Sequence, residues 1–273
     1  MAKSILAGVD QMFDKHLLPE DAKRHGQAPH FHHGRTLNAI IRAGWREIPV
    51  DLFNNTLGQI ETNYAEGLSF KASESLWKLR KAKEVQPKQR TPEVTLERHM
   101  VSHLGDNWFN QLSTASGLVG SAEGKKRAID LVERIGAGRF RFFELKVASN
   151  TPLAAAIEIL EYGLLFAFAR KHSGKLFHSK PVPEVLSATA LELRVLAPTS
   201  YYDKHDSGRR LGWLEAEFSK SFGGFASVFG FKADFQFLSF QQDFRWNAHD
   251  AAEDISLGEK LKCAYDAVRP VYS

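Results

Sequence analysis

The chain has 273 residues, of which 43% are hydrophobic and 11% aromatic, enough for one large domain or for a core domain with an accessory part. This composition excludes a disordered chain, and the single cysteine, Cys263, excludes an internal disulfide framework and fits a reducing cytoplasm. The net charge of +4 lies wholly in residues 1–90, which hold 14 Lys and Arg against 10 Asp and Glu. Such an excess fits either a polyanion partner or an ordinary solvated surface.

Residues 1–90 are expected to form a mostly helical, basic accessory region. Apolar positions at helical spacing predict helices over residues 4–18, 35–45, 50–64 and 73–83. Pro87 and Pro92 mark a boundary near residue 90, so that residues 91–273 form a second part. No apolar run near the N-terminus is long enough for a signal peptide, so a cytoplasmic protein is expected.

Two polar features of this first region are candidates for ligand contacts. The loop after the first helix holds four histidines, but it lacks the cysteine partners and regular spacing of a structural zinc site: His25, His30, His32 and His33. A surface loop, or phosphate contacts beside Arg35, is favoured over a metal site. The run from Trp77 to Arg90 holds six basic residues against Glu84 alone. It is either a solvated helix face or a contact for a nucleic-acid backbone.

From residue 91 the pattern predicts alternating helices and strands. Thr91-Pro92 begins a helix to residue 104, on which Glu97 lies beside the apolar stripe of Leu96 and Met100. The pattern then predicts a strand at 117–120, a hairpin at 126–148 and a long apolar helix from Pro152. After these it predicts a strand at 191–195, a helix capped by Ser207, a strand at 231–237 and a helix at 256–268. This order predicts an α/β sandwich around a mixed sheet. The long helix carries Glu158 and Glu161, which disfavours a membrane span.

The hairpin places two carboxyl groups opposite each other. If its turn is centred on Ala137, paired residue numbers sum to 274, so that Asp130 faces Glu144 with Cβ atoms about 5 Å apart. The strand period of two puts Lys146 on the same face as Glu144. Facing carboxylates repel, and either Lys146 or a hard divalent cation such as Mg²⁺ or Mn²⁺ could relieve that repulsion.

This element order, with Glu97 on the first helix, Asp130 on the second strand and Glu144-Leu145-Lys146 on the third, resembles the PD-(D/E)xK nuclease superfamily, whose core is the restriction-endonuclease-like fold. The resemblance covers about residues 91–240. Ile129 stands where proline often precedes the family's aspartate. Glu158, Glu161 and Tyr162 lie on the helix where some members place an auxiliary polar residue, and that match is loose.

The resemblance implies Mg²⁺-dependent hydrolysis of phosphodiester bonds, with DNA as the expected substrate, 5′-phosphate products, and a defence, mobile-element or repair context. Asp130, Glu144 and the Leu145 carbonyl would ligate the metal, with Glu97 assisting directly or through water. Lys146 would orient the attacking water or stabilise the transition state. Double-stranded cuts would fit a homodimer, and other protein partners are equally open.

Two alternatives use the same residues differently. Asp130, Glu144 and Lys146 could form a structural ion-pair cluster, either in a non-catalytic nucleic-acid-binding or assembly protein on the same fold or in an unrelated hairpin. Residues 1–90 could instead serve as a helical module that binds a partner protein. Glu158 and Glu161 could face the metal or pair with basic residues in the core.

Overall fold

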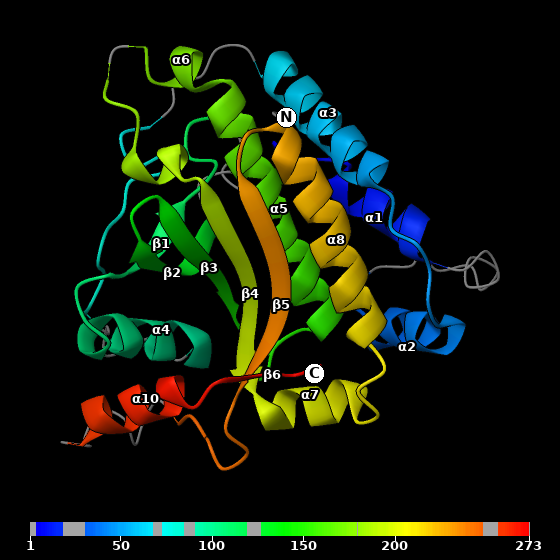
Figure 1. Ribbon diagram of the computed structural model, residues 1–273, viewed down its shortest axis with the longest axis vertical. Coiled ribbons are helices and arrows are strands. Elements are labelled where there is room, and N and C mark those ends of the chain that lie inside the picture. Colours follow the sequence, from blue (N-terminus) through cyan, green and yellow to red (C-terminus); the bar gives the residue numbers. More distant parts are fainter. Residues whose placement is uncertain are drawn as a thin grey trace.

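The computed structural model describes residues 4–18, 31–67, 73–84, 91–118, 127–178, 180–247 and 256–272. The described residues form one six-stranded mixed sheet with helices on both faces, which confirms the predicted α/β class (Figure 1). Whether its core is restriction-endonuclease-like stays a prediction.

The strands follow one another across the sheet in chain order: β1 (Trp108–Ser113), β2 (Ala128–Gly136), β3 (Arg139–Leu145), β4 (Ala190–Pro198), β5 (Lys232–Phe240) and β6 (Arg269–Pro270). The first three strands pair antiparallel, β3, β4 and β5 pair parallel, and β6 adds an antiparallel edge. Parallel neighbours need crossover helices, and the predicted long helix supplies the first of them.

The helices cover both faces of the sheet. Their bounds are α1 (Val9–Leu17), α2 (Gly34–Ala43), α3 (Val50–Glu66), α4 (Pro92–His103), α5 (Pro152–Lys171), α6 (Ser173–Leu176), α7 (Thr199–Asp206), α8 (Gly212–Val228) and α10 (Leu257–Asp266), with a 3₁₀ turn, η3 (Glu184–Ser187). On one face α5 and α8 lie against the sheet, with α1 and α3 outside them; α4 and α10 lie on the other face (Figure 1). Helix α5 connects β3 to β4, and α7 with α8 connects β4 to β5.

Two hydrophobic cores result from this layering. The larger core joins the sheet to α5, α8, α3 and α1, for example where the rings of Phe53 and Phe222 meet edge to face at 5.3 Å. The smaller core joins the opposite face to α4 and α10 and contains Leu96, Leu131 and Leu261. The helices of the first 90 residues therefore share the larger core with α5. Whether the chain divides near residue 90 stays a prediction.

Helix α5 is the central helix of the larger core. The Thr151 side chain caps it by accepting the Ala154 N–H at 3.2 Å. The helix is long and apolar enough to cross a membrane, but 94% of its most apolar window is buried inside the protein, as in a core helix of a soluble protein. It packs so closely that a Cβ added at Gly163 would lie 2.5 Å from Phe222 Cζ and 2.9 Å from Leu193 Cδ1.

The predicted helix at 73–83 is wrong, and the residues form a short turn followed by an extended segment. The Trp77 side chain is fully buried, and the backbone N–H of Trp77 donates to the Ser113 carbonyl at 2.8 Å. The Asn110 N–H then donates to the Arg80 carbonyl at 3.0 Å. The segment runs along the outer edge of β1, where these bonds satisfy N–H and carbonyl groups of the edge strand. If the segment were a helix, those groups of β1 would lack hydrogen-bond partners.

Two further expectations differ from the structure. The first strand lies at Trp108–Ser113 rather than at 117–120, of which residues 119 and 120 fall outside the described ranges. Ser207 does not cap α8; instead the Asp206 carboxylate accepts the N–H groups of Arg210 and Leu211 at 2.9 and 3.0 Å. Arg210 and Leu211 lie just before the first residue of α8, so the Asp206 carboxylate, at the end of α7, fixes the turn between the two helices.

Candidate active site

The β2–β3 hairpin has the predicted register. Leu131 pairs with Phe143, and the next three pairs keep the same sum of 274 before a bulge near Gly136. One residue further along, the same register would place Asp130 opposite Glu144, and that pair stays a prediction. The Leu145 N–H donates to Asp130 Oδ2 at 2.9 Å, so the carboxyl group of Asp130 reaches the end of β3.

A buried lysine links two carboxylates beside this point. Lys146 Nζ lies 2.5 Å from Glu144 Oε1 and 3.2 Å from Glu158 Oε2. Glu144 and Lys146 are only 3% and 6% exposed. The second oxygen of Glu144 is buried and has no hydrogen-bond partner among the described residues. Glu158, whose role the sequence left open, therefore belongs to this cluster.

At Asp130 the alternation of side chains along β2 changes, so that positions that pointed to one face of the sheet now point to the other. The neighbouring strand β1 makes the same change. Trp108 and Leu131 belong to the smaller core, whereas Leu112 and Ile129 belong to the larger one. Residues two apart on a regular strand share a face, so both strands change face between these positions. Asp130 lies at that change.

Gln111 lies at the change of face on β1, and its side chain holds the Glu97 carboxylate in place. Gln111 continues the β1–β2 register opposite Asp130 and has a left-handed backbone, with φ of 50°. Its side-chain amide donates to Glu97 Oε2 at 2.6 Å, and that of Asn110 donates to Glu97 Oε1 at 2.7 Å. Glu97 is 1% exposed. A non-glycine residue in this conformation stores strain of about 1–3 kcal/mol, a feature that concentrates at functional sites.

Three acids of the cluster, Glu97, Asp130 and Glu144, have raised pKa values, whereas the pKa of Glu158 is lowered because the effect of burial is outweighed by Lys146 together with a hydrogen bond to Glu144. Burial and the nearby charge of Asp130 raise the pKa of Glu97 to about 8, although two amide donors oppose the shift. Burial raises the pKa of Asp130 to about 6, against the opposing effect of Lys146. Burial together with Asp130 and Glu158 raises the pKa of Glu144 well above its usual range. Burial would lower the pKa of Lys146, but the surrounding carboxylates raise it.

Glu161 points to a different neighbourhood. Its Oε2 lies 3.5 Å from Arg127 Nη1, and it shares a hydrogen bond with Asp10 of α1. Burial and this carboxyl pairing raise the pKa of Glu161 well above its usual range. Glu161 thus links α5 to the N-terminal helix and makes none of the contacts that Glu158 makes with Lys146.

Two adjacent tyrosines on α7 differ in their partners. The Tyr202 hydroxyl donates to the carbonyls of Val195 and Leu238, both at 3.1 Å. The Tyr201 hydroxyl is buried without a partner among the described residues, and its pKa, raised by burial, also responds to the charges of Lys146 and Glu144. No sequence pattern singles out Tyr201, because neither the short helix α7 nor its packing is evident from residue spacing.

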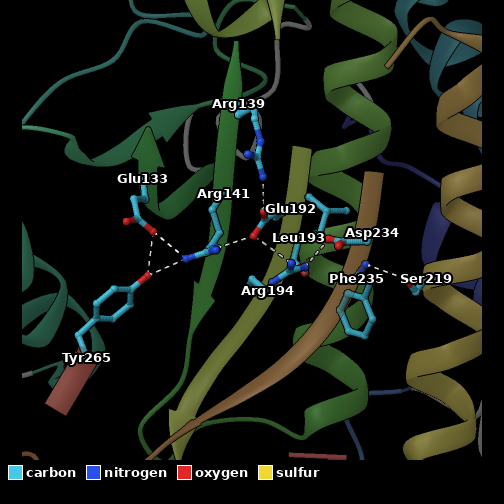
Figure 2. A network of polar contacts seen from close by, with 10 residues as sticks. All are labelled: Glu133, Arg139, Arg141, Glu192, Leu193, Arg194, Ser219, Asp234, Phe235 and Tyr265. Atoms are coloured by element: carbon cyan, nitrogen blue, oxygen red, sulfur yellow. Dashed lines mark hydrogen bonds and ion pairs between the residues drawn. The ribbon is translucent and has the colours of Figure 1, made fainter. Parts of the chain in front are cut away.

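A second charged cluster crosses the sheet at the beginning of β3, β4 and β5 (Figure 2). Arg141 donates to Glu133 at 2.9 Å and to Glu192 at 2.7 Å, and Arg194 donates to Asp234 at 2.6 Å. Arg139 and Tyr265 complete the network, in which three arginines balance three carboxylates. These pairs tie neighbouring strands together. The Lys146 cluster is different, since its lysine pairs with two carboxylates, Glu144 and Glu158, and has a third carboxyl group, that of Asp130, nearby.

Of the remaining sequence candidates, Tyr162 lies near this cluster: burial, together with the charges of Glu158, Glu144 and Asp130, raises its pKa well above its usual range. Of the four histidines, His25 and His30 lie outside the described residues. In the part of the chain that the structure describes, no group of three or more His, Cys, Asp and Glu side chains is arranged around a metal position. Lys146 occupies the space between Glu144 and Glu158 instead.

Comparison of the chain with family models, with curated proteins and with solved structures gives no match. The function therefore has to be inferred from the chemistry of the Lys146 cluster and from the surface around it.

Proposed function

We propose that the chain is a metal-dependent nuclease that hydrolyses phosphodiester bonds, with DNA as its substrate. The observation that carries the proposal is the cluster at the end of β3, where Lys146 pairs with Glu144 and Glu158 and also acts on the charge of Asp130. Glu97 lies close enough to Asp130 for the two carboxyl groups to interact. Burying uncompensated carboxyl groups lowers stability, and strongly perturbed acids are typical of functional sites. The order α4, β1, β2, β3, α5, β4 is also the order that the PD-(D/E)xK resemblance implies.

The residues present fit a hard divalent cation. The donors are carboxylate oxygens, which Mg²⁺ and Mn²⁺ prefer, and Glu144 has an oxygen without a partner in the described structure. Asp130, Glu144 and the Leu145 carbonyl would hold the ion, with Glu97 as an assisting ligand. When bound, the ion would polarise the phosphoryl oxygen and lower the pKa of the attacking water.

The chain's own side chains have distinct roles in this proposal. The Lys146 ammonium donates to the phosphoryl oxygens as negative charge builds on them, or orients the attacking water. Glu158 holds this ammonium in place through its 3.2 Å contact. Asn110 and Gln111 fix the orientation of Glu97 through both of its oxygens.

A second candidate is a non-catalytic nucleic-acid-binding or assembly protein on the same fold. It is favoured by one observation: Lys146 already pairs with two carboxylates, as in a structural ion-pair cluster. The two candidates differ in cleavage, because only the first cuts DNA when a metal is added.

Supercoiled plasmid incubated with Mg²⁺, Mn²⁺ or EDTA tests the proposal. The wild-type protein is expected to cut with metal and not with EDTA, and Asp130→Ala is expected to slow cutting at least about 100-fold. Asp234→Ala, which removes an acid from the second charged cluster, is the matched control and should cut normally. Cutting by Asp130→Ala at the wild-type rate would show that the site assignment is wrong.

A further inference from the structure

We propose that the extended segment from Lys78 to Lys83 binds the phosphodiester backbone of DNA beside the candidate active site. The inference rests on the proposed function for its ligand and adds the surface that holds that ligand. The segment was expected to be a helix, and its extended form is what places its basic side chains along one edge of the sheet.

The first argument is position. Arg80 Nε donates to the Gln111 carbonyl at 2.9 Å, and the Gln111 side chain donates to Glu97. The Asn110 amide contacts both the Ala82 carbonyl, at 2.9 Å, and Glu97. Two hydrogen bonds therefore separate this segment from a proposed ligand of the metal.

The second argument is charge. Lys78, Arg80 and Lys83 are exposed, and in the described structure none of them has a carboxylate within ion-pairing distance. The arginines of the second charged cluster, by contrast, are each paired with carboxylates (Figure 2). Unpaired Lys and Arg side chains are the groups that neutralise phosphates and release counterions.

The third argument is that the segment is already ordered. The buried Trp77 anchors its start, and Ala82 both donates to and accepts from the Asn110 side chain. Lys81 pairs with Asp106 at 2.9 Å and lies 5.6 Å from the centre of the Phe109 ring. A preformed surface binds its ligand without a further ordering cost.

The test is fluorescence anisotropy of a labelled DNA duplex in EDTA, which allows binding without metal-dependent cutting, at several salt concentrations. The triple variant Lys78→Ala/Arg80→Ala/Lys83→Ala is compared with Lys171→Ala/Lys220→Ala/Lys232→Ala. Both variants lose three positive charges, but the control residues lie on α5, α8 and β5. Thermal unfolding checks that both are folded.

Each lost phosphate contact removes about 0.9 from the slope of log K against log salt. We expect the slope of the Lys78–Lys83 triple variant to be less steep by about 2 to 3, and its DNA affinity to be at least about tenfold lower than that of the wild type. The slope and affinity of the control triple variant should be close to those of the wild type. Because Arg80 also contacts Gln111, the double variant Lys78→Ala/Lys83→Ala is measured too, and should lose about two thirds as much.

Equal losses in the two triple variants would overturn the inference, because they would reflect net charge alone. Unchanged binding by the Lys78–Lys83 variants, or no DNA binding by the wild type, would also overturn it. A slope loss seen with RNA but not with DNA of the same length would contradict the assigned ligand. A wild-type protein that binds through this segment but never cuts with Mg²⁺ would support the inference and refute the nuclease proposal.

Discussion

Asp130→Asn should stabilise the metal-free protein while it abolishes cleavage. Burial raises the pKa of Asp130 from 3.8 to about 6. Because the folded-state pKa is raised, this carboxyl contributes its full stability below about pH 4 and loses it as the pH rises through about 6. A difference of about two pH units corresponds to about 3 kcal/mol.

Asparagine has nearly the same shape and still accepts the Leu145 N–H, but it carries no charge to bury. An amide accepts this hydrogen bond more weakly than a carboxylate does. We therefore expect the free energy of unfolding of Asp130→Asn to exceed that of the wild type by about 1–3 kcal/mol at pH 8. The assay is urea unfolding in EDTA between pH 4 and 9. The gain should vanish near pH 4, and saturating Mg²⁺ should stabilise the wild type but not the variant.

A variant less stable than the wild type at pH 8 in EDTA would refute this reasoning. That result would mean that Asp130 is held in a net favourable ion pair, as in a purely structural cluster. Asp234→Asn, which removes an acid paired with Arg194 at the surface, is the control and should change stability by less than about 1 kcal/mol.

Three further predictions concern other parts of the molecule. Glu158→Gln should slow cleavage about tenfold at unchanged DNA affinity, because it weakens the support of Lys146; an unchanged rate would place Glu158 outside the mechanism. Gly163→Ala should lower the free energy of unfolding by about 1–3 kcal/mol, whereas Gly58→Ala, in open space on α3, should raise it by up to about 1 kcal/mol; equal effects would contradict the packing around α5. Tyr202→Phe should cost about 1–3 kcal/mol in urea unfolding and Tyr201→Phe almost nothing, and equal losses would mean that the Tyr201 hydroxyl has a partner.

The hairpin was predictable from the sequence because its physics is local. A strand period of two and a turn centred on Ala137 predict the pair of Leu131 with Phe143, which the structure has. The turn itself pairs Gly136 with Arg139, and a bulge between Arg134 and Gly136 restores the predicted register. The long helix was predictable for a similar reason, since Thr151-Pro152 begins an apolar run longer than any strand.

The rest of the site depends on contacts between distant segments. The segment at 73–83 has helical composition, but the edge of β1 binds its backbone, and tertiary contacts override propensity. The change of face on β1 coincides with the left-handed backbone of Gln111, which is not a residue type that signals this conformation. Nor could helical spacing separate Glu158 from Glu161, which lie three residues apart but contact different partners.

The most direct test of the proposed nuclease function is the rate at which labelled DNA is cut in Mg²⁺ by the wild type and by Lys146→Ala. Linear, circular, single-stranded and branched DNA are compared, with Lys171→Ala as the control and EDTA as the blank. The account predicts metal-dependent cutting that falls at least about 100-fold in Lys146→Ala, with DNA affinity and the Lys171→Ala rate unchanged. Cutting by Lys146→Ala at the wild-type rate, or no cutting of any substrate by a folded wild-type protein that binds DNA, would contradict it.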